Sequence, residues 1–201
     1  MKITLLDCGV SNVASVERAL QRLGAESQRA ATPECVSSAD ALLLPGVGHF
    51  EAFIHVLDDR KLRAPLCAAI HRGVPFLGIC LGLQALYDVS DEAPQLTGLQ
   101  LLPGRVCALP PVVKLPHMGW NRLASKNRSR LLEGVDANAY FYFAHTYAAI
   151  EQAPETVAVC EYGTEFVAVL EKENMCAVQF HPEKSGAAGA QVLRNFLRLC
   201  A

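Results

Sequence analysis

Short apolar runs alternate with amphipathic segments along the first half of the chain. Apolar runs bounded by glycine or proline are typical of buried strands, and the pattern predicts strands at residues 2–6, 41–44 and 75–79. Apolar positions that recur every three to four residues predict helices at 13–23, 49–59, 62–72 and 81–87. Alternation of this kind favours βαβ units and a mostly parallel sheet.

The second half of the chain has a different pattern. Segments rich in β-branched and aromatic residues are separated by turns rich in Gly, Asn and Glu, which predicts strands that either extend the sheet or form a smaller one. These strands cover residues 105–109, 140–143, 156–162, 166–170 and 176–180. Helical periodicity returns at 188–199, and we expect this last helix to pack on the sheet. The whole pattern indicates an α/β fold.

Composition narrows the class of protein. The chain has 201 residues, 51% of them hydrophobic, which is enough for one compact domain. A net charge of -2 gives no general attraction to nucleic acid or anionic membranes. Because no segment approaches the roughly 18 apolar residues of a membrane span and the amino-terminal run is too short for a signal peptide, we expect a cytosolic protein.

Among 8 cysteines without metal-site spacing, Cys80 stands out. A cysteine in a reducing compartment is usually a small buried hydrophobe. Cys80, however, lies between glycines in the sequence G-I-C-L-G (78–82), where a predicted strand meets a predicted helix. This is the pattern of a nucleophile elbow, and the amino end of the following helix favours the thiolate form. We therefore expect Cys80 to be a nucleophile.

The sequence H-P-E (181–183) follows the predicted strand 176–180. Carboxyl ends of parallel strands share one edge of a sheet, so His181 and Cys80 are expected to meet there. His181 would accept the Cys80 proton, and Glu183 would hold the imidazole in the required tautomer. Alone, His181 would be read as a surface histidine; together with Cys80 it predicts a Cys-His-Glu triad.

The glycine-rich turn P-G-V-G (45–48) follows another central strand. Its glycines allow backbone amides to face a developing oxyanion, and the amide of Leu81 is the natural second donor. A plain βα turn would have the same appearance. The turn is not a dinucleotide fingerprint, because G-x-G-x-x-G and a Walker lysine are both missing.

These motifs together resemble the class I, or triad, glutamine amidotransferases over nearly the whole chain. Further segments resemble those of the glutaminase subunits of imidazole glycerol phosphate synthases: D-C-G-V-S-N-V-A-S-V (7–16), L-P-G-V-G (44–48), G-I-C-L-G-L-Q (78–84), P-H-M-G-W-N (116–121), Y-F-Y-F-A-H-T-Y (140–147) and Q-F-H-P-E-K-S (179–185). Cys8 and Ser11 depart from the pattern, since many relatives have Tyr and Gly there. The resemblance implies a three-layer, flavodoxin-like α/β fold in a single glutamine amidotransferase type 1 domain (1–201), with a mostly parallel central sheet flanked by helices and extra antiparallel strands.

The same resemblance implies an activity and its residues. Cys80 would attack the glutamine side-chain amide, ammonia would leave, and water would hydrolyse the γ-glutamyl thioester, with His181 moving the protons. Gly48 and Leu81 would form the oxyanion hole after a rearrangement of the oxyanion strand. Gln84, Thr146 and Tyr147 match positions that hold the α-amino and carboxylate groups of glutamine. No cofactor or metal is expected.

A partner is also implied, because ammonia released into neutral water becomes ammonium and loses its nucleophilicity. In the family, a TIM-barrel cyclase subunit of imidazole glycerol phosphate synthase forms a heterodimer with the glutaminase. It uses the ammonia to make imidazole glycerol phosphate and aminoimidazole carboxamide ribotide in histidine biosynthesis. The positions that match those facing the cyclase are Trp120, Asn121, Tyr142 and Lys184, which include the aromatic and cationic types common in interfaces.

Three alternatives stay open at this point. The chain could serve another synthase, such as the pyridoxal phosphate or anthranilate enzymes, although P-H-M-G-W-N and Y-F-Y-F argue against this. It could be a silent scaffold subunit, which the intact Cys80, His181 and Glu183 disfavour. It could also be a stand-alone cysteine hydrolase of γ-glutamyl compounds, which would turn over fully without a partner.

Overall fold

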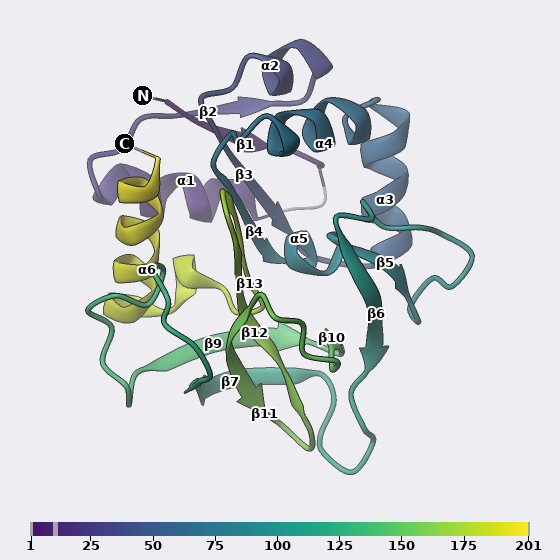
Figure 1. Ribbon diagram of the computed structural model, residues 1–201, viewed down its shortest axis with the longest axis vertical. Helices are drawn as coiled ribbons and strands as arrows, with labels where there is room; N and C mark the ends of the chain where they lie inside the picture. The colour runs from purple at the N-terminus through teal and green to yellow at the C-terminus, as the bar shows by residue number, and fades with distance from the viewer. Residues whose placement is uncertain (1, 10–11, 201) are drawn as a thin grey trace.

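The computed structural model describes residues 2–9 and 12–200, so Val10 and Ser11 of the first motif lie outside the described residues. Over these residues an eight-stranded central sheet runs through the molecule (Figure 1). Its strand order is β2 (Ser27–Ala30), β1 (Ile3–Leu6), β3 (Ala41–Gly46), β4 (Phe76–Cys80), β13 (Met175–Val178), β12 (Glu165–Lys172), β11 (Thr156–Glu161) and β8 (Ala124–Ser125). The strands from β2 to β13 pair in parallel, and those beyond β13 pair antiparallel.

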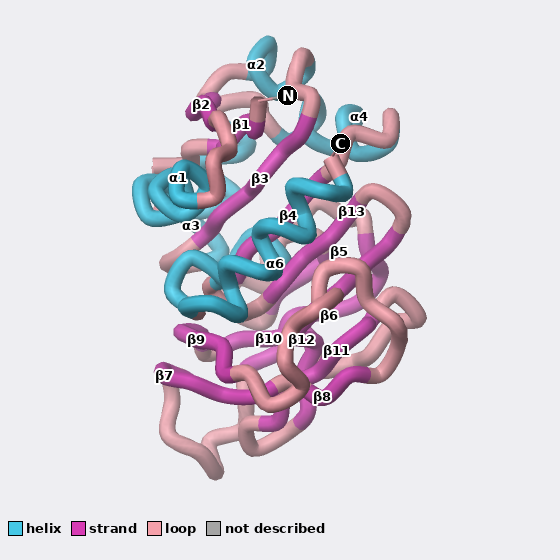
Figure 2. The backbone as a smooth tube through the Cα atoms, turned by 90° about the vertical axis from the view of Figure 1, so that its left-hand side faces the viewer, coloured by secondary structure: helices cyan, strands magenta, loops and turns pink. Residues whose placement is uncertain are grey.

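Helices cover both faces of the parallel part. In Figure 1, α1 (Val13–Arg22) and α6 (Gly186–Leu199) lie to the left of the strands, and α3 (Phe50–Asp59) and α4 (Arg63–His71) lie to the right. Figure 2, turned by 90°, shows α1 and α6 in front of β3, β4 and β13. The expected three-layer, mostly parallel architecture with extra antiparallel strands is confirmed.

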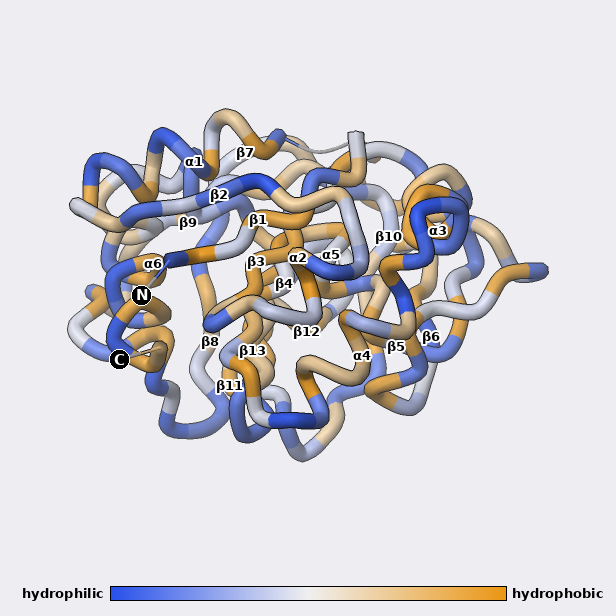
Figure 3. Tube along the Cα trace, turned by 90° about the horizontal axis from the view of Figure 1, so that it is seen from above, coloured by the Kyte–Doolittle hydropathy of each residue, from blue (hydrophilic) through white to orange (hydrophobic). Residues whose placement is uncertain are grey.

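Two hydrophobic clusters hold the layers together, one on each face of the sheet. Alternate residues of a strand point to opposite faces, so in β3 Leu42 and Leu44 join the cluster of α3 and α4, while Ala41 and Leu43 join that of α1 and α6. Because both faces are covered, β3 and β4 are buried along their whole length. Figure 3 shows these strands as hydrophobic segments near the middle of the molecule.

Two small sheets complete the fold. One contains β10 (Tyr147–Ala149), β6 (Leu102–Ala108) and β5 (Tyr87–Ser90), and the other pairs β7 (His117–Arg122) with β9 (Tyr140–His145). The sequence left open whether the later strands extend the main sheet or form a smaller one. The structure does both, since β8, β11 and β12 extend the main sheet.

The helix expected at 81–87 was wrong at its carboxyl end. The helix α5 covers only Leu81–Gln84, and Tyr87 already belongs to β5. The cause is tertiary: the carbonyl of Ala85 accepts from the amide of Leu99 at 2.6 Å, and the carbonyl of Leu86 accepts from that of Leu101 at 2.9 Å. These bonds remove the carbonyls from any further helical turn.

Several short elements were not anticipated from the sequence: β2, β5, β7, β8, β10 and α2 (Pro33–Ser37). The strand β2 lies at the edge of the sheet and has one fully buried residue, so its sequence S-Q-R-A lacks apolar alternation. None of the helices in the described part of the chain is both long and apolar enough to cross a membrane.

Candidate active site

Cys80 is the last residue of β4 and directly precedes α5. Its backbone has φ of 55° and ψ of -107°, in the left-handed half of conformational space that non-glycine residues rarely adopt. Such strain persists only where the surrounding structure enforces it, and it concentrates at functional sites. The side chain is 4% exposed and lines a cavity at the carboxyl end of the sheet. The strand, sharp turn and helix of a nucleophile elbow are therefore present.

The glycines beside Cys80 provide space for this turn. A Cβ on Gly82 would lie 2.0 Å from the carbonyl oxygen of Leu44, and a Cβ on Gly78 would lie 2.7 Å from the carbonyl oxygen of Gly82. Gly46 is equally tight, because its Cβ would lie 2.7 Å from the Cβ of Leu81. The elbow thus packs directly on β3, and the residue that carries the backbone strain is Cys80 itself.

Substituting Gly82 with alanine is expected to lower the free energy of unfolding by about 3 kcal/mol, because the rigid β3 carbonyl cannot move away from the new methyl group. The matched control is Gly24→Ala, where φ is +76° but no atom lies within 4 Å of the new Cβ. In this control the new side chain introduces only the strain of a left-handed backbone, so the free energy of unfolding should fall by only about 1 kcal/mol. Urea unfolding of both variants measures the difference, and equal losses would contradict the packing argument.

His181 reaches the same edge of the sheet through β13, the parallel neighbour of β4. Its Nδ1 lies 2.9 Å from Oε1 of Glu183, and both side chains are buried, with exposed fractions of 2% and 1%. The Cys80 thiol lies close enough to the same imidazole to raise its pKa. Because Nδ1 is engaged by Glu183, Nε2 is the nitrogen left for an exchange of protons with the sulfur. The structure thus brings together all three residues of the expected triad.

The electrostatics of this group favour a charged imidazole. Burial alone would lower the pKa of His181, but the negative charge and hydrogen bond of the Cys80 thiolate, together with those of Glu183, raise it from 6.5 to about 10. Within the part of the chain that the structure describes, Oε2 of Glu183 has no hydrogen-bond partner. The arrangement therefore favours the protonated imidazole of His181 at neutral pH.

Backbone contacts fix the loop that carries His181. The amide of His181 donates to the carbonyl of Tyr142 at 2.8 Å. The hydroxyl of Ser185 accepts from the amide of Tyr142 at 2.9 Å and donates to the carbonyl of His181 at 2.7 Å. These bonds join the end of β13 to β9, so the imidazole is held by the small sheet as well as by the large one.

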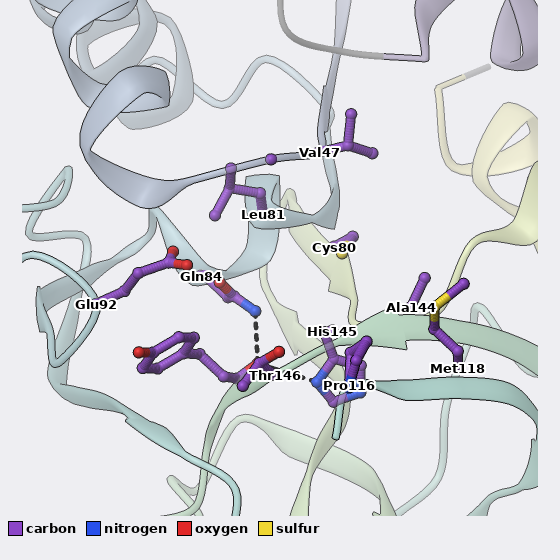
Figure 4. Close-up of a pocket in the computed structure, with 12 residues that line it drawn as sticks. Val47, Cys80, Leu81, Gln84, Glu92, Pro116, Met118, Ala144, His145 and Thr146 are labelled. Carbon is purple, nitrogen blue, oxygen red and sulfur yellow. Dashed lines mark hydrogen bonds between the residues drawn. The ribbon is translucent and has the colours of Figure 1, made fainter. Parts of the chain in front are cut away.

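A cavity of about 180 Å³ opens beside the sulfur of Cys80. Pockets for drug-sized ligands occupy about 300–1,000 Å³, so this cavity suits a much smaller molecule, of amino-acid size. Six of its lining residues were expected from the sequence: Gly48, Cys80, Leu81, Gln84, Thr146 and Tyr147. In Figure 4, Cys80, Leu81 and Gln84 face Thr146, His145 and Pro116 across the cavity.

Two polar residues in this region were not predicted from sequence motifs. Glu92 brings a carboxylate to the wall of the cavity, and its Oε2 also accepts from the amide of Phe50 at 2.7 Å, at the start of α3. It follows β5, a strand that was not anticipated from the sequence, and no motif marked it. Gln179 is fully buried, and its Nε2 lies 3.6 Å from Sγ of Cys80. Gln179 lies within the motif Q-F-H-P-E-K-S, but no role was assigned to it from the sequence.

The expected oxyanion donors lie on two neighbouring elements. Leu81 is the first residue of α5, where backbone amides lack intrahelical partners. Gly48 follows β3 with φ of 96°, a conformation that favours glycine. Both residues line the cavity next to Cys80.

A cluster of exposed and half-buried side chains lies close to the triad. Trp120 is 55% exposed, and its ring centroid lies 5.9 Å from that of Tyr142. Nζ of Lys184 lies 5.4 Å from the centre of the Tyr142 ring, which in turn lies 6.4 Å from the ring of His181. We call Trp120, Tyr142 and Lys184 the aromatic patch. Asn121 alternates to the other side of β7, where its side chain donates to the carbonyl of Glu161 at 2.9 Å.

The remaining titratable groups do not suggest other chemistry. Among residues 2–9 and 12–200, no three His, Cys, Asp or Glu side chains gather in a group that could hold a metal ion. Burial raises the pKa of four other thiols to about 12, which keeps them protonated: Cys8, Cys160, Cys176 and Cys200.

Comparison with known proteins identifies the family of the chain. The family model described as "Glutamine amidotransferase class-I" matches residues 4–200. A protein of Methanothermobacter thermautotrophicus named imidazole glycerol phosphate synthase subunit HisH is 47% identical over 98% of both chains. A protein of the same name from Pectobacterium atrosepticum is 44% identical over 99% of this chain and 100% of its own length.

Solved structures show the same fold at lower sequence identity. One described as a glutamine amidotransferase has a TM-score of 0.78 and 18% identity, and the match covers 98% of both chains. A putative GMP synthase protein from Thermoplasma acidophilum has a TM-score of 0.73 and 20% identity over 100% of this chain and 94% of its own.

Proposed function

The chain belongs to the class I glutamine amidotransferases, and within them to the HisH glutaminase subunits of imidazole glycerol phosphate synthase. We therefore propose that Cys80, His181 and Glu183 release ammonia from glutamine for a second subunit. The single observation that carries this assignment of residues is the buried triad beside a cavity of amino-acid size. We propose a single glutamine amidotransferase domain over residues 1–201. Its eight free cysteines suit the reducing cytoplasm, which is the proposed location.

The proposed reaction has two halves. The Cys80 thiolate attacks the side-chain amide carbon, and the imidazolium of His181 gives a proton to the nitrogen, so that ammonia leaves and a γ-glutamyl thioester forms. Neutral His181 then takes a proton from water, which attacks the thioester. Glutamate departs, and the sulfur is again a thiolate beside imidazolium. Glu183 retains its charge throughout and stabilises imidazolium.

The other cavity residues have complementary tasks in this proposal. The amides of Gly48 and Leu81 stabilise the oxyanion of each tetrahedral intermediate. Gln84 and the carboxylate of Glu92 accept hydrogen bonds from the α-ammonium group of glutamine, while Thr146 and Tyr147 hold its α-carboxylate. All of these residues line the cavity, which supports their assignment.

The proposed partner is the TIM-barrel cyclase of the same synthase, in a heterodimer. The aromatic patch is the proposed docking surface, because exposed aromatic and cationic side chains are common interface anchors. Asn121 supports this surface from the other side of β7. Tyr142 belongs to the patch, and its carbonyl accepts a hydrogen bond from the amide of His181. The strand β9 therefore carries part of the proposed docking surface and also holds the catalytic base in place.

We expect the purified chain alone to hydrolyse glutamine slowly, and a cyclase subunit with its ribotide ligand to raise the rate by at least about tenfold. The physical reason is that docking on Tyr142 restrains the segment that positions His181. Glutamate production measured with and without the partner tests this. Equal rates would overturn the coupled synthase and favour a stand-alone hydrolase.

A further inference from the structure

A chain of buried hydrogen bonds leads from the wall of the cavity to the nucleophile. The carbonyl of Tyr147 lies 2.7 Å from Nε2 of Gln84, and this same nitrogen lies 3.2 Å from Oε1 of Gln179. Nε2 of Gln179 then lies 3.6 Å from Sγ of Cys80. Both glutamines are buried, and Gln179 is completely inaccessible.

The direction of every bond follows from chemistry. A carbonyl can only accept, so the group of Gln84 that faces Tyr147 is its NH2. The second hydrogen of that NH2 points at Gln179 and requires an acceptor, which is the amide oxygen of Gln179. The NH2 of Gln179 is thereby directed towards Cys80. No rotation of either amide by 180° satisfies the same set of bonds.

Two buried imidazoles hold the far end of the chain. Nδ1 of His145 lies 3.0 Å from the same Tyr147 carbonyl and therefore carries a hydrogen. Nε2 of His145 then accepts from Nδ1 of His117 at 3.2 Å. Burial lowers the pKa of His117 to about 4, and burial with the nearby His117 lowers that of His145 to about 3, so both stay neutral and keep these tautomers at neutral pH.

We propose that Gln179 is a further catalytic residue, whose side-chain NH2 donates a hydrogen bond that stabilises the Cys80 thiolate. This inference rests on the proposed function, since it adds a residue to the same glutaminase site. A hydrogen bond to a charged group is stronger than one to a neutral group, so the contact favours the thiolate over the thiol. His181 and Gln179 thus contact one sulfur from the same segment that follows β13.

The network also determines what Gln84 offers to a substrate. Both hydrogens of its NH2 are used inside the protein, so its oxygen is the atom left for the cavity. An amide oxygen accepts hydrogen bonds and matches an ammonium group, whereas it repels a carboxylate. Substrate recognition at Gln84 and stabilisation of the sulfur by Gln179 therefore depend on the same bond between the two amides.

The test is the pH dependence of Cys80 alkylation by iodoacetamide, followed by mass spectrometry of the peptide that contains Cys80. Gln179→Met keeps the length of the side chain and removes the donor, so the alkylation midpoint should rise by about one pH unit. Other titratable groups around the sulfur stay in place: His145, His181, Glu92 and Glu183. At neutral pH, kcat for glutamine in the complex should fall about tenfold and should recover at higher pH, whereas KM should rise because the bond that orients Gln84 is lost as well.

Asn195→Leu is the matched control. Asn195 is another buried amide, on α6, and it donates to the carbonyls of Leu131 and Glu133, both at 2.8 Å. Its loss should destabilise the fold and leave the alkylation midpoint unchanged. An unchanged midpoint in Gln179→Met, or an equal shift in Asn195→Leu, would overturn the role of Gln179.

A second variant is needed in case Gln179→Met does not fold, which would show as the absence of a cooperative unfolding transition. Gln179→Glu retains the oxygen that accepts from Gln84, replaces the donor facing the sulfur with a second oxygen and adds negative charge beside it. It should also raise the midpoint, and no shift would overturn the proposal. Alkylation requires neither glutamine nor a partner. If the complex failed to use glutamine while the midpoint shifted as expected, the proposed function would fail and the contact between Gln179 and the thiolate would stand.

Discussion

Cys80→Ala is expected to lower glutamine-dependent synthesis by at least about 10⁴-fold, because no other group can form the thioester. Synthesis from added ammonia should be unchanged, since the ammonia-consuming site belongs to the partner in our proposal. The measurement compares the two nitrogen sources in the reconstituted complex. A variant that lacks only the nucleophile loses synthesis from glutamine, whereas a complex that fails to assemble would lose the stimulation by the partner as well.

The matched control for this variant is Cys160→Ala. Cys160 is as buried as Cys80, but it lies in β11. Burial raises its pKa to about 12, so its thiol stays protonated at neutral pH. The folded Cys160→Ala variant should synthesise product from glutamine and from added ammonia at wild-type rates. Retention of glutamine use by Cys80→Ala would instead favour the silent scaffold.

Glu183→Gln is expected to lower kcat for glutamine by about 10²–10⁴-fold. Glu183 is buried against His181, and its Oε2 has no partner among the described residues, so a glutamine fits the same space with its oxygen on Nδ1. The substitution removes the charge and largely preserves the geometry. Steady-state kinetics in the complex measure the loss, and a change below about threefold would contradict a role for the charge.

The same variant has a signature in its pH profile. His181 must be protonated to give a proton to the amide nitrogen that leaves as ammonia, and its raised pKa of about 10 keeps it so up to alkaline pH. Glu183 is one cause of that increase, so its neutral replacement lowers the pKa of His181. The alkaline decline of kcat should move to lower pH. Leu197→Ala, a half-buried change near the carboxyl end of α6, should leave the decline in place.

The central part of the site could be predicted from the sequence because each piece lay at a recognisable junction. The strand β4, the elbow at Cys80 and the strand before His181 all follow from apolar runs that end in glycine or H-P-E. Parallel strands end at one edge, so these motifs had to meet. The resemblance to known amidotransferases supplied Gln84, Thr146 and Tyr147, which composition and periodicity alone would not have selected.

Other features depend on tertiary contacts that leave no local pattern. The helix α5 ends early because the amides of Leu99 and Leu101 bind the carbonyls that follow it, so the expected helix extended to the first residue of β5. Glu92, which follows β5, could not be located without that correction. Gln179 was quoted inside a motif, but its contact with Cys80 depends on a side chain from α5 and a carbonyl from β10.

The close packing at Gly46 has a geometric consequence for the oxyanion turn. Gly46 is fixed against Leu81 and lies in register with Cys80, while the amide of Phe50 is held by Glu92. The backbone between these two anchors behaves as a closed linkage of fixed span, so one peptide can rotate only if its neighbours counter-rotate. Gly48, with its left-handed φ, is the pivot where that crankshaft motion meets least steric resistance.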